Sequence, residues 1–122
     1  DSGVVAAVQY AGIEALNGPQ DSVGVMRRLY AGRRDAVVKG LRGLGWNLQK
    51  PQATIYVWAP VPEDYTSIEF AALLLEETGV VVTPGISYGQ YGEGYFRISL
   101  CVEKERIETA IDRIRDAGIR YS

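Results

Sequence analysis

One arginine in the second half of the chain stands in a setting suited to carboxylate binding. Arg97 lies in the run Tyr95-Phe96-Arg97-Ile98-Ser99-Leu100, in which apolar residues alternate with the others. The alternation predicts a half-buried strand, with Arg97 on the face opposite to the apolar residues. A guanidinium on a rigid strand presents a planar fork of donors that matches a carboxylate. On this pattern alone an edge-strand arginine in solvent is the favoured interpretation, because charged residues usually stay exposed, and an arginine that binds an anionic ligand is the alternative.

A loop rich in glycine and tyrosine precedes this strand, over residues 86–94. Gly92 and Gly94 flank Glu93, and two glycines so close together predict a tight turn. Tyr88 lies earlier in the same loop. Ordinary packing within the loop would account for Tyr88 on this pattern alone.

The composition excludes several other kinds of site. The chain has 122 residues, no histidine and a single cysteine, Cys101. The lack of histidine rules out Ser-His-Asp chemistry and histidine-based metal sites, so we expect no metal. The 13 basic and 15 acidic residues form no block of like charge, which argues against a nucleic-acid or membrane partner. No apolar run approaches the roughly 20 residues that span a bilayer, and we expect a cytoplasmic protein.

Several elements must position Arg97. The patterns predict helices over residues 4–16, 20–44, 66–79 and 102–117, and strands over 53–58, 80–82 and 95–100. Thr66 and Glu69 form a capping-box pattern at the start of the third helix. The prolines of the loop over residues 59–64 are expected to end the first strand. The expected fold class is α+β, with a small sheet of about three strands, helices packed on one face and one long bridging helix.

The long helix carries two arginine pairs, Arg27-Arg28 and Arg33-Arg34. Both pairs are short, and we expect them to form a solvated or salt-bridged face. The helix over residues 4–16 has valines, isoleucine and leucine with alanines between them, which suits a helix buried on much of its surface.

Four blocks of residues occur in a characteristic order. They are Ala15-Leu16-Asn17-Gly18-Pro19-Gln20; Tyr30 with Arg33-Arg34-Asp35; Pro51-x-Ala53-Thr54-x-Tyr56-Val57-Trp58; and Gly79 to Gly85 followed by Gly92 to Leu100. On these blocks the chain resembles the class I and II aminotransferases, which are pyridoxal-phosphate enzymes of fold type I. With Asp1-Ser2-Gly3 and the loop Ala59-Pro60-Val61-Pro62, it is most similar to the LL-diaminopimelate aminotransferases. The resemblance covers essentially the whole chain.

The resemblance implies a place for this chain within a longer enzyme. Residues 19–122 would form the C-terminal small domain, including the long connecting helix over residues 20–44, and residues 1–18 would pack on an absent large domain. Arg97 would bind the substrate α-carboxylate, and the loop with Tyr88 would approach the substrate. The substrates would be an amino acid, with LL-2,6-diaminopimelate and lysine biosynthesis as the specific expectation, and a 2-oxo acid. The enzyme would be a homodimer.

The same resemblance implies parts that this chain does not contain. Transamination needs a lysine that forms a Schiff base with pyridoxal 5'-phosphate. The family carries this lysine earlier, in a Ser-x-x-Lys-like or Ser-Lys stretch before a Gly-x-Arg-x-Gly pattern, whereas Lys39, Lys50 and Lys104 have no such context. We therefore expect no catalytic and no cofactor-binding residue here, and a chain that is inactive alone.

Two other hypotheses stay open. The chain could be a stand-alone amino-acid-binding or regulatory α+β module without catalysis. It could also be a structural domain in which Arg97 pairs with a nearby carboxylate such as Glu93. The absence of an initiator methionine and the apolar opening helix favour a piece of a longer aminotransferase.

Overall fold

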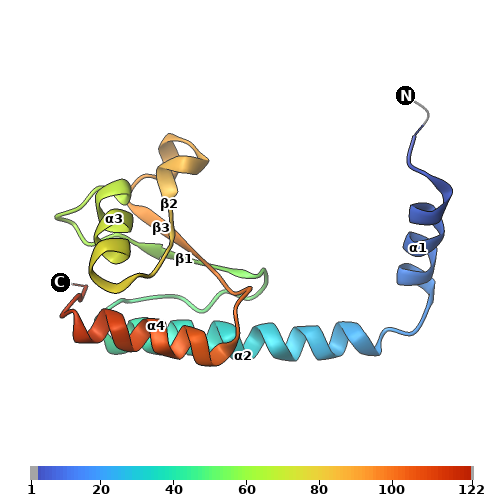
Figure 1. Cartoon of the computed structure of the whole chain (residues 1–122), viewed down its shortest axis with the longest axis horizontal. Coiled ribbons are helices and arrows are strands. Elements are labelled where there is room, and N and C mark those ends of the chain that lie inside the picture. Colours follow the sequence, from blue (N-terminus) through green and yellow to red (C-terminus); the bar gives the residue numbers. More distant parts are fainter. Residues whose placement is uncertain (1–2, 122) are drawn as a thin grey trace.

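A three-stranded antiparallel sheet covered by helices on one face organises the chain (Figure 1). The computed structural model describes residues 3–121, so Asp1 and Ser2 of the resemblance lie outside the described residues. The elements in chain order are α1 (Ala6–Asn17), α2 (Asp21–Gly43), β1 (Tyr56–Pro60), α3 (Ser67–Thr78), β2 (Thr83–Pro84), η1 (Gly85–Tyr88), η2 (Gln90–Gly92), β3 (Tyr95–Ser99) and α4 (Lys104–Asp116). The strand order is β1-β3-β2. The expected α+β class with helices on one face is confirmed.

The core lies between the sheet and helices α2, α3 and α4. Val57 and Phe96 point into it from the sheet, and Ile111 of α4 closes it from the other side. Trp46 and Phe70 fill the centre, with ring centroids 6.1 Å apart. Each fully buried large apolar side chain contributes about 1.5–3 kcal/mol, so this cluster is the main source of stability.

Two helix predictions are confirmed, for α3 by the structure of its ends and for α4 by its buried face. The side chain of Thr66 caps α3, accepting from the Glu69 amide at 3.3 Å, while the Glu69 carboxylate accepts from the Thr66 amide at 2.9 Å. Gly79 ends the helix in the left-handed conformation, with φ of 68°. Helix α4 buries Ile107, Ile111 and Ile114, as its pattern predicts. No helix in residues 3–121 is long and apolar enough to cross a membrane.

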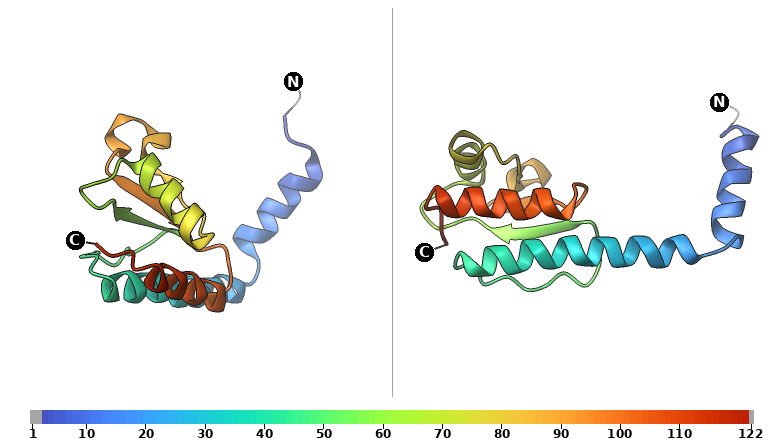
Figure 2. Two further views of the ribbon diagram at one scale, coloured as in Figure 1. Left: turned by 60° about the vertical axis from the view of Figure 1, so that its left-hand side comes forward. Right: turned by 60° about the horizontal axis from the view of Figure 1, so that its bottom comes forward.

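The first part of the chain stands apart from this body. None of the residues of α1 is buried, and Ile13 and Leu16 are 54% and 82% exposed. The first half of α2 is exposed as well, and Figure 2 shows α1 held away from the sheet by α2. The prediction that the first helix is buried on much of its surface is therefore wrong for residues 3–121, because no other described element covers α1.

The second half of α2 is bound to the rest of the domain through its arginines. The Arg33 side chain is only 8% exposed, with its guanidinium 2.9 Å from the Glu103 carboxylate and 3.1 Å from the Leu100 carbonyl oxygen. The expectation of a salt-bridged face is confirmed at this residue. The ion-paired Arg33 side chain is itself buried, because the core packs around α2 at this point.

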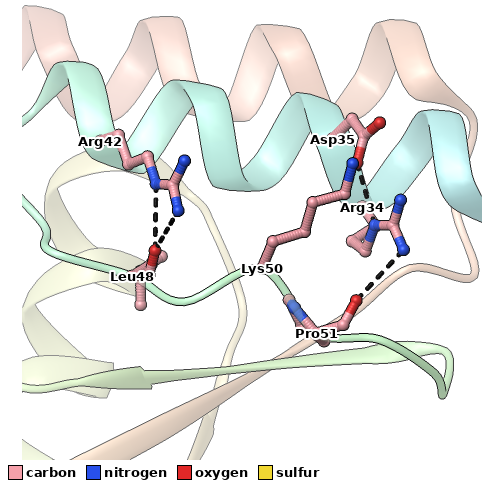
Figure 3. Close-up of polar contacts among 6 residues, drawn as sticks. All are labelled: Arg34, Asp35, Arg42, Leu48, Lys50 and Pro51. Atoms are coloured by element: carbon pink, nitrogen blue, oxygen red, sulfur yellow. Dashed lines mark hydrogen bonds and ion pairs between the residues drawn. The ribbon is translucent and has the colours of Figure 1, made fainter.

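The segment that connects α2 to β1 is held along its length by α2 (Figure 3). Arg42 donates to the Leu48 carbonyl oxygen at 3.0 Å, and Arg34 donates to the Pro51 carbonyl oxygen at 3.1 Å. Lys50 forms an ion pair with Asp35 at 2.8 Å. These contacts fix the path by which the chain enters the sheet.

The first strand is displaced from its predicted position. It was expected over residues 53–58, but β1 begins at Tyr56 and continues through Pro60. Thr54 has φ of 75°, which an L-residue rarely adopts and which interrupts an extended run. Proline lacks a backbone donor but is tolerated at an edge strand, and β1 is an edge.

The predicted strand over residues 80–82 is wrong. The second strand is instead the short pair Thr83–Pro84. The Val80 amide donates to the Leu74 carbonyl oxygen at 3.3 Å and to the Thr78 hydroxyl at 3.2 Å. The end of helix α3 therefore takes the hydrogen bond that a sheet ladder would need, and Val81 is 79% exposed.

The loop between β2 and β3 contains the two short helical turns η1 and η2. Its base is closed by Gly85 and Gly92. A Cβ atom on either glycine would overlap the carbonyl oxygen of the other. Neither has a positive φ, so close backbone approach is what requires glycine at these two positions.

We predict that Gly92→Ala lowers the free energy of unfolding by about 1–3 kcal/mol, because the backbone cannot make room for the methyl group without a shift. The matched control is Gly32→Ala in α2, where an added Cβ meets nothing within 4 Å. That substitution should raise stability by up to about 1 kcal/mol through helix propensity. Urea unfolding of both variants measures the difference, and equal effects would refute the close-approach explanation.

Candidate functional site

The side chains on the uncovered face of the sheet form the candidate site. Arg97 lies on the central strand, opposite Trp58 of β1 on one side and Thr83 of β2 on the other. Its neighbour Phe96 is 1% exposed on the core face. Because successive side chains of a strand alternate between faces, burial of Phe96 holds Arg97 on the uncovered face.

Arg97 is held there by aromatic rings. The central carbon of its guanidinium lies 4.0 Å from the ring centroid of Tyr56 and 4.8 Å from that of Tyr88. The Trp58 ring lies 5.8 Å from Tyr88 and stacks on Tyr95 at 5.7 Å. A cation over an aromatic face gains about 0.5–2 kcal/mol, so these rings stabilise the charged arginine.

An open cleft of about 550 Å³ adjoins the guanidinium. The residues that line it are Gln49, Lys50, Pro51, Gln52, Thr54, Tyr56, Trp58 and Arg97. Among residues 3–121, no carboxylate forms an ion pair with Arg97, and its buried Nε atom has no hydrogen-bond partner. The arrangement is that of a guanidinium open to an external carboxylate.

Glu93 is engaged elsewhere, and the structure thus contradicts its proposed pairing with Arg97. The Glu93 carboxylate accepts from the Ser67 amide at 2.7 Å and from the Ser67 hydroxyl at 2.8 Å. Ser67 is the first residue of α3, where free amides and the helix dipole favour an anion. The hydrogen bonds from the Ser67 amide and hydroxyl lower the pKa of Glu93 below its ordinary value of 4.5. This contact anchors the loop that carries Tyr88 to the helix.

The three lysines of the chain lie in different settings. Lys50 is paired with Asp35 at 2.8 Å, and Lys104 lies 3.4 Å from Glu108. Lys39 is exposed on α2. A lysine that forms a Schiff base must present a free amine inside a site. Lys50 lines the cleft beside Arg97, but its amine is ion-paired with Asp35, and neither Lys39 nor Lys104 is among the residues that line this cleft. Nor do residues 3–121 contain a group of three or more acidic or cysteine side chains that could hold a metal.

The structure brings the two residues singled out from the sequence together. Tyr88 and Arg97 are in contact, whereas Tyr91 of the same loop is 91% exposed. The predicted roles of Arg97 and Tyr88 remain predictions. Tyr56 and Trp58 join them on this face, since both alternate onto the side opposite to Val57. Sequence patterns alone could not place them beside Arg97, because the register between β1 and β3 was unknown.

Comparisons with known proteins agree on one family. The family described as "Aminotransferase class I and II" matches residues 3–114. The LL-diaminopimelate aminotransferase of Moorella thermoacetica is 59% identical over 115 residues, which are 94% of this chain and 30% of that protein.

Two solved structures show the same fold. An aminotransferase from Staphylococcus aureus has a TM-score of 0.89 and 30% identity, with 100% of this chain and 32% of that chain covered. L,L-Diaminopimelate aminotransferase from Chlamydomonas reinhardtii has a TM-score of 0.85 and 26% identity, with 99% of this chain and 29% of that chain covered. The chain spans 30% and 31% of the length of the two curated relatives that it matches at 59% and 51% identity.

We predict that Glu93 makes stability depend on pH in the acid range. Its pKa is lowered in the folded state, so its contribution is complete above 4.5 and is lost as the pH falls through the folded value. Glu93→Gln should flatten the fall in stability below pH 4.5, and Ser67→Ala should flatten it in part, because the Ser67 amide still donates. Urea midpoints measured as a function of pH test this. An unchanged acid dependence in Glu93→Gln would contradict it.

Proposed function

The chain belongs to the class I and II aminotransferases, and from this premise we propose that it is the C-terminal small-domain part of a longer transaminase. Residues 19–122 correspond to that domain, with α2 as the connecting helix, and residues 1–18 pack on the large domain. The enzyme transfers an amino group between an amino acid and a 2-oxo acid. The exposed apolar side chains of α1 support this division, because isolated proteins rarely expose large apolar surfaces.

The contribution of this chain is Arg97, and one observation carries the proposal. The guanidinium stands on the central strand, without a carboxylate partner in residues 3–121, beside an open cleft. An amino acid and its 2-oxo acid share the α-carboxylate, so one arginine binds the substrate of both half-reactions. A two-point hydrogen-bonded clamp also orients the Cα–H bond, which is where the proton is removed. Tyr88 lines the same position from the loop.

The cofactor is held by another part of the enzyme. The three lysines are exposed or ion-paired, so the chain offers no residue to bind pyridoxal phosphate covalently. Arg97 binds and orients the substrate, and the catalytic groups come from the large domain.

The substrate that we propose is LL-2,6-diaminopimelate, in lysine biosynthesis. The support is the name shared by relatives at 59% and 51% identity over most of this chain. A homodimer and a cytoplasmic location are further parts of the proposal, and the family assignment supports them. The competing function is an amino-acid-binding module that works without the large domain.

We predict that this chain forms no covalent adduct with pyridoxal phosphate. The purified chain, mixed with the cofactor and reduced with borohydride, should show no stoichiometric mass increase by intact mass spectrometry. A single-lysine adduct with an aldimine absorbance band would refute the assignment of the cofactor site to another part of the enzyme.

We predict that Arg97→Ala in the full-length enzyme lowers kcat/KM, mainly by raising the KM for the amino acid. The loss should correspond to about 2–5 kcal/mol of activation free energy. Arg97→Lys should have a kcat/KM between those of the wild type and Arg97→Ala, because lysine keeps the positive charge but lacks the planar fork of donors. The exposed Arg120→Ala is the matched control and should leave kcat/KM unchanged. A loss below tenfold for Arg97→Ala would remove Arg97 from the site.

A further inference from the structure

We propose that Tyr56 is the positioning residue for Arg97, and that its ring face fixes the plane of the guanidinium that receives the substrate carboxylate. The inference rests on the proposed function of Arg97 and adds a residue to it. Tyr56 makes the shorter of the two guanidinium–ring contacts, at 4.0 Å.

The usual means of orienting an arginine are missing at this site. Within residues 3–121, Arg97 has no carboxylate partner, and its Nε atom is buried without a hydrogen bond. A carboxylate partner would neutralise the charge and occupy the donors that the substrate needs. A ring face attracts the cation without using any N–H group, so the outer donors stay available for a ligand.

Tyr56 is well placed to act as the fixed support. It is partly buried and is paired with Ser99 in the sheet, diagonal to Arg97. The Ile55 carbonyl oxygen before it accepts from the Leu100 amide at 2.9 Å, which holds the start of the strand. Tyr88 makes the longer contact of 4.8 Å, is 50% exposed and comes from a loop. The sheet residue is therefore the support, and the loop residue is secondary.

The contact uses the aromatic face and not the hydroxyl, which sets the choice of variants. Tyr56→Phe keeps the face. Tyr56→Leu keeps an apolar side chain of moderate size but has no ring, and Tyr56→Met is a second non-aromatic variant if leucine disturbs the strand. Tyr88→Leu tests the secondary contact. Far-ultraviolet circular dichroism establishes that each variant is folded.

The first measurement does not depend on activity. In nuclear magnetic resonance spectra of the chain, the Arg97 Nε–H signal should be protected from exchange and shifted by the neighbouring ring. We expect Tyr56→Phe to preserve this signal, and Tyr56→Leu and Tyr56→Met to lose both the shift and the protection. A signal that is unchanged in the folded non-aromatic variants would overturn the proposal.

The second measurement uses the full-length enzyme. Tyr56→Leu should raise the KM for the amino acid about tenfold with a smaller change in kcat, whereas Tyr56→Phe should stay within about twofold of wild type. Equal KM values for the phenylalanine and leucine variants would overturn the positioning role. If Arg97→Ala leaves KM unchanged while the Arg97 signal still depends on the ring at position 56, the proposed function fails and the structural support by Tyr56 stands.

Discussion

The alternation of side chains along β3 is the constraint on which the rest of the structure depends. Phe96 is fixed in the core, with its ring centroid 5.1 Å from that of Phe70. Arg97, the next residue of the strand, must therefore lie on the opposite face of the sheet. A shift of the strand by one residue would bring the charged guanidinium into the core and expose the phenylalanine. The apolar contacts that stabilise the domain therefore also determine where its one open guanidinium on the sheet points.

Much of the fold follows from local signals in the sequence. The helices have strong periodicity, and the caps at Thr66 and Gly79 have the residue types that helix ends require. The strands were less well predicted, since their limits depend on partners distant in the sequence. Thr54, with its positive φ, and Val80, whose amide is taken by the preceding helix, show how local backbone events move a strand away from the β-branched run that suggests it.

The candidate site, like the fold, could be predicted from the sequence only in part. Alternation along the strand predicts the face on which Arg97 lies, whereas the expected binding roles of Arg97 and Tyr88 come from the family resemblance. The rings of Tyr56 and Trp58 could not be placed from the sequence, because only the pairing register of β1 with β3 brings them beside the arginine. The hypothesis that Glu93 pairs with Arg97 is wrong because closeness in sequence does not determine the contact. Glu93 is close to Arg97 in sequence, but the amide and hydroxyl at the start of α3 bind its carboxylate.

The long helix α2 has a mechanical consequence. Its 23 residues span about 35 Å at 1.5 Å per residue, and only its second half is bound to the domain that carries Arg97. The whole helix, about 35 Å long, therefore acts as a rigid lever arm between α1 and that domain. A tilt of about 10° over that length displaces the far end by about 6 Å. Small angular changes at the junction of α1 and α2 would thus become displacements of several ångströms in the domain that carries Arg97.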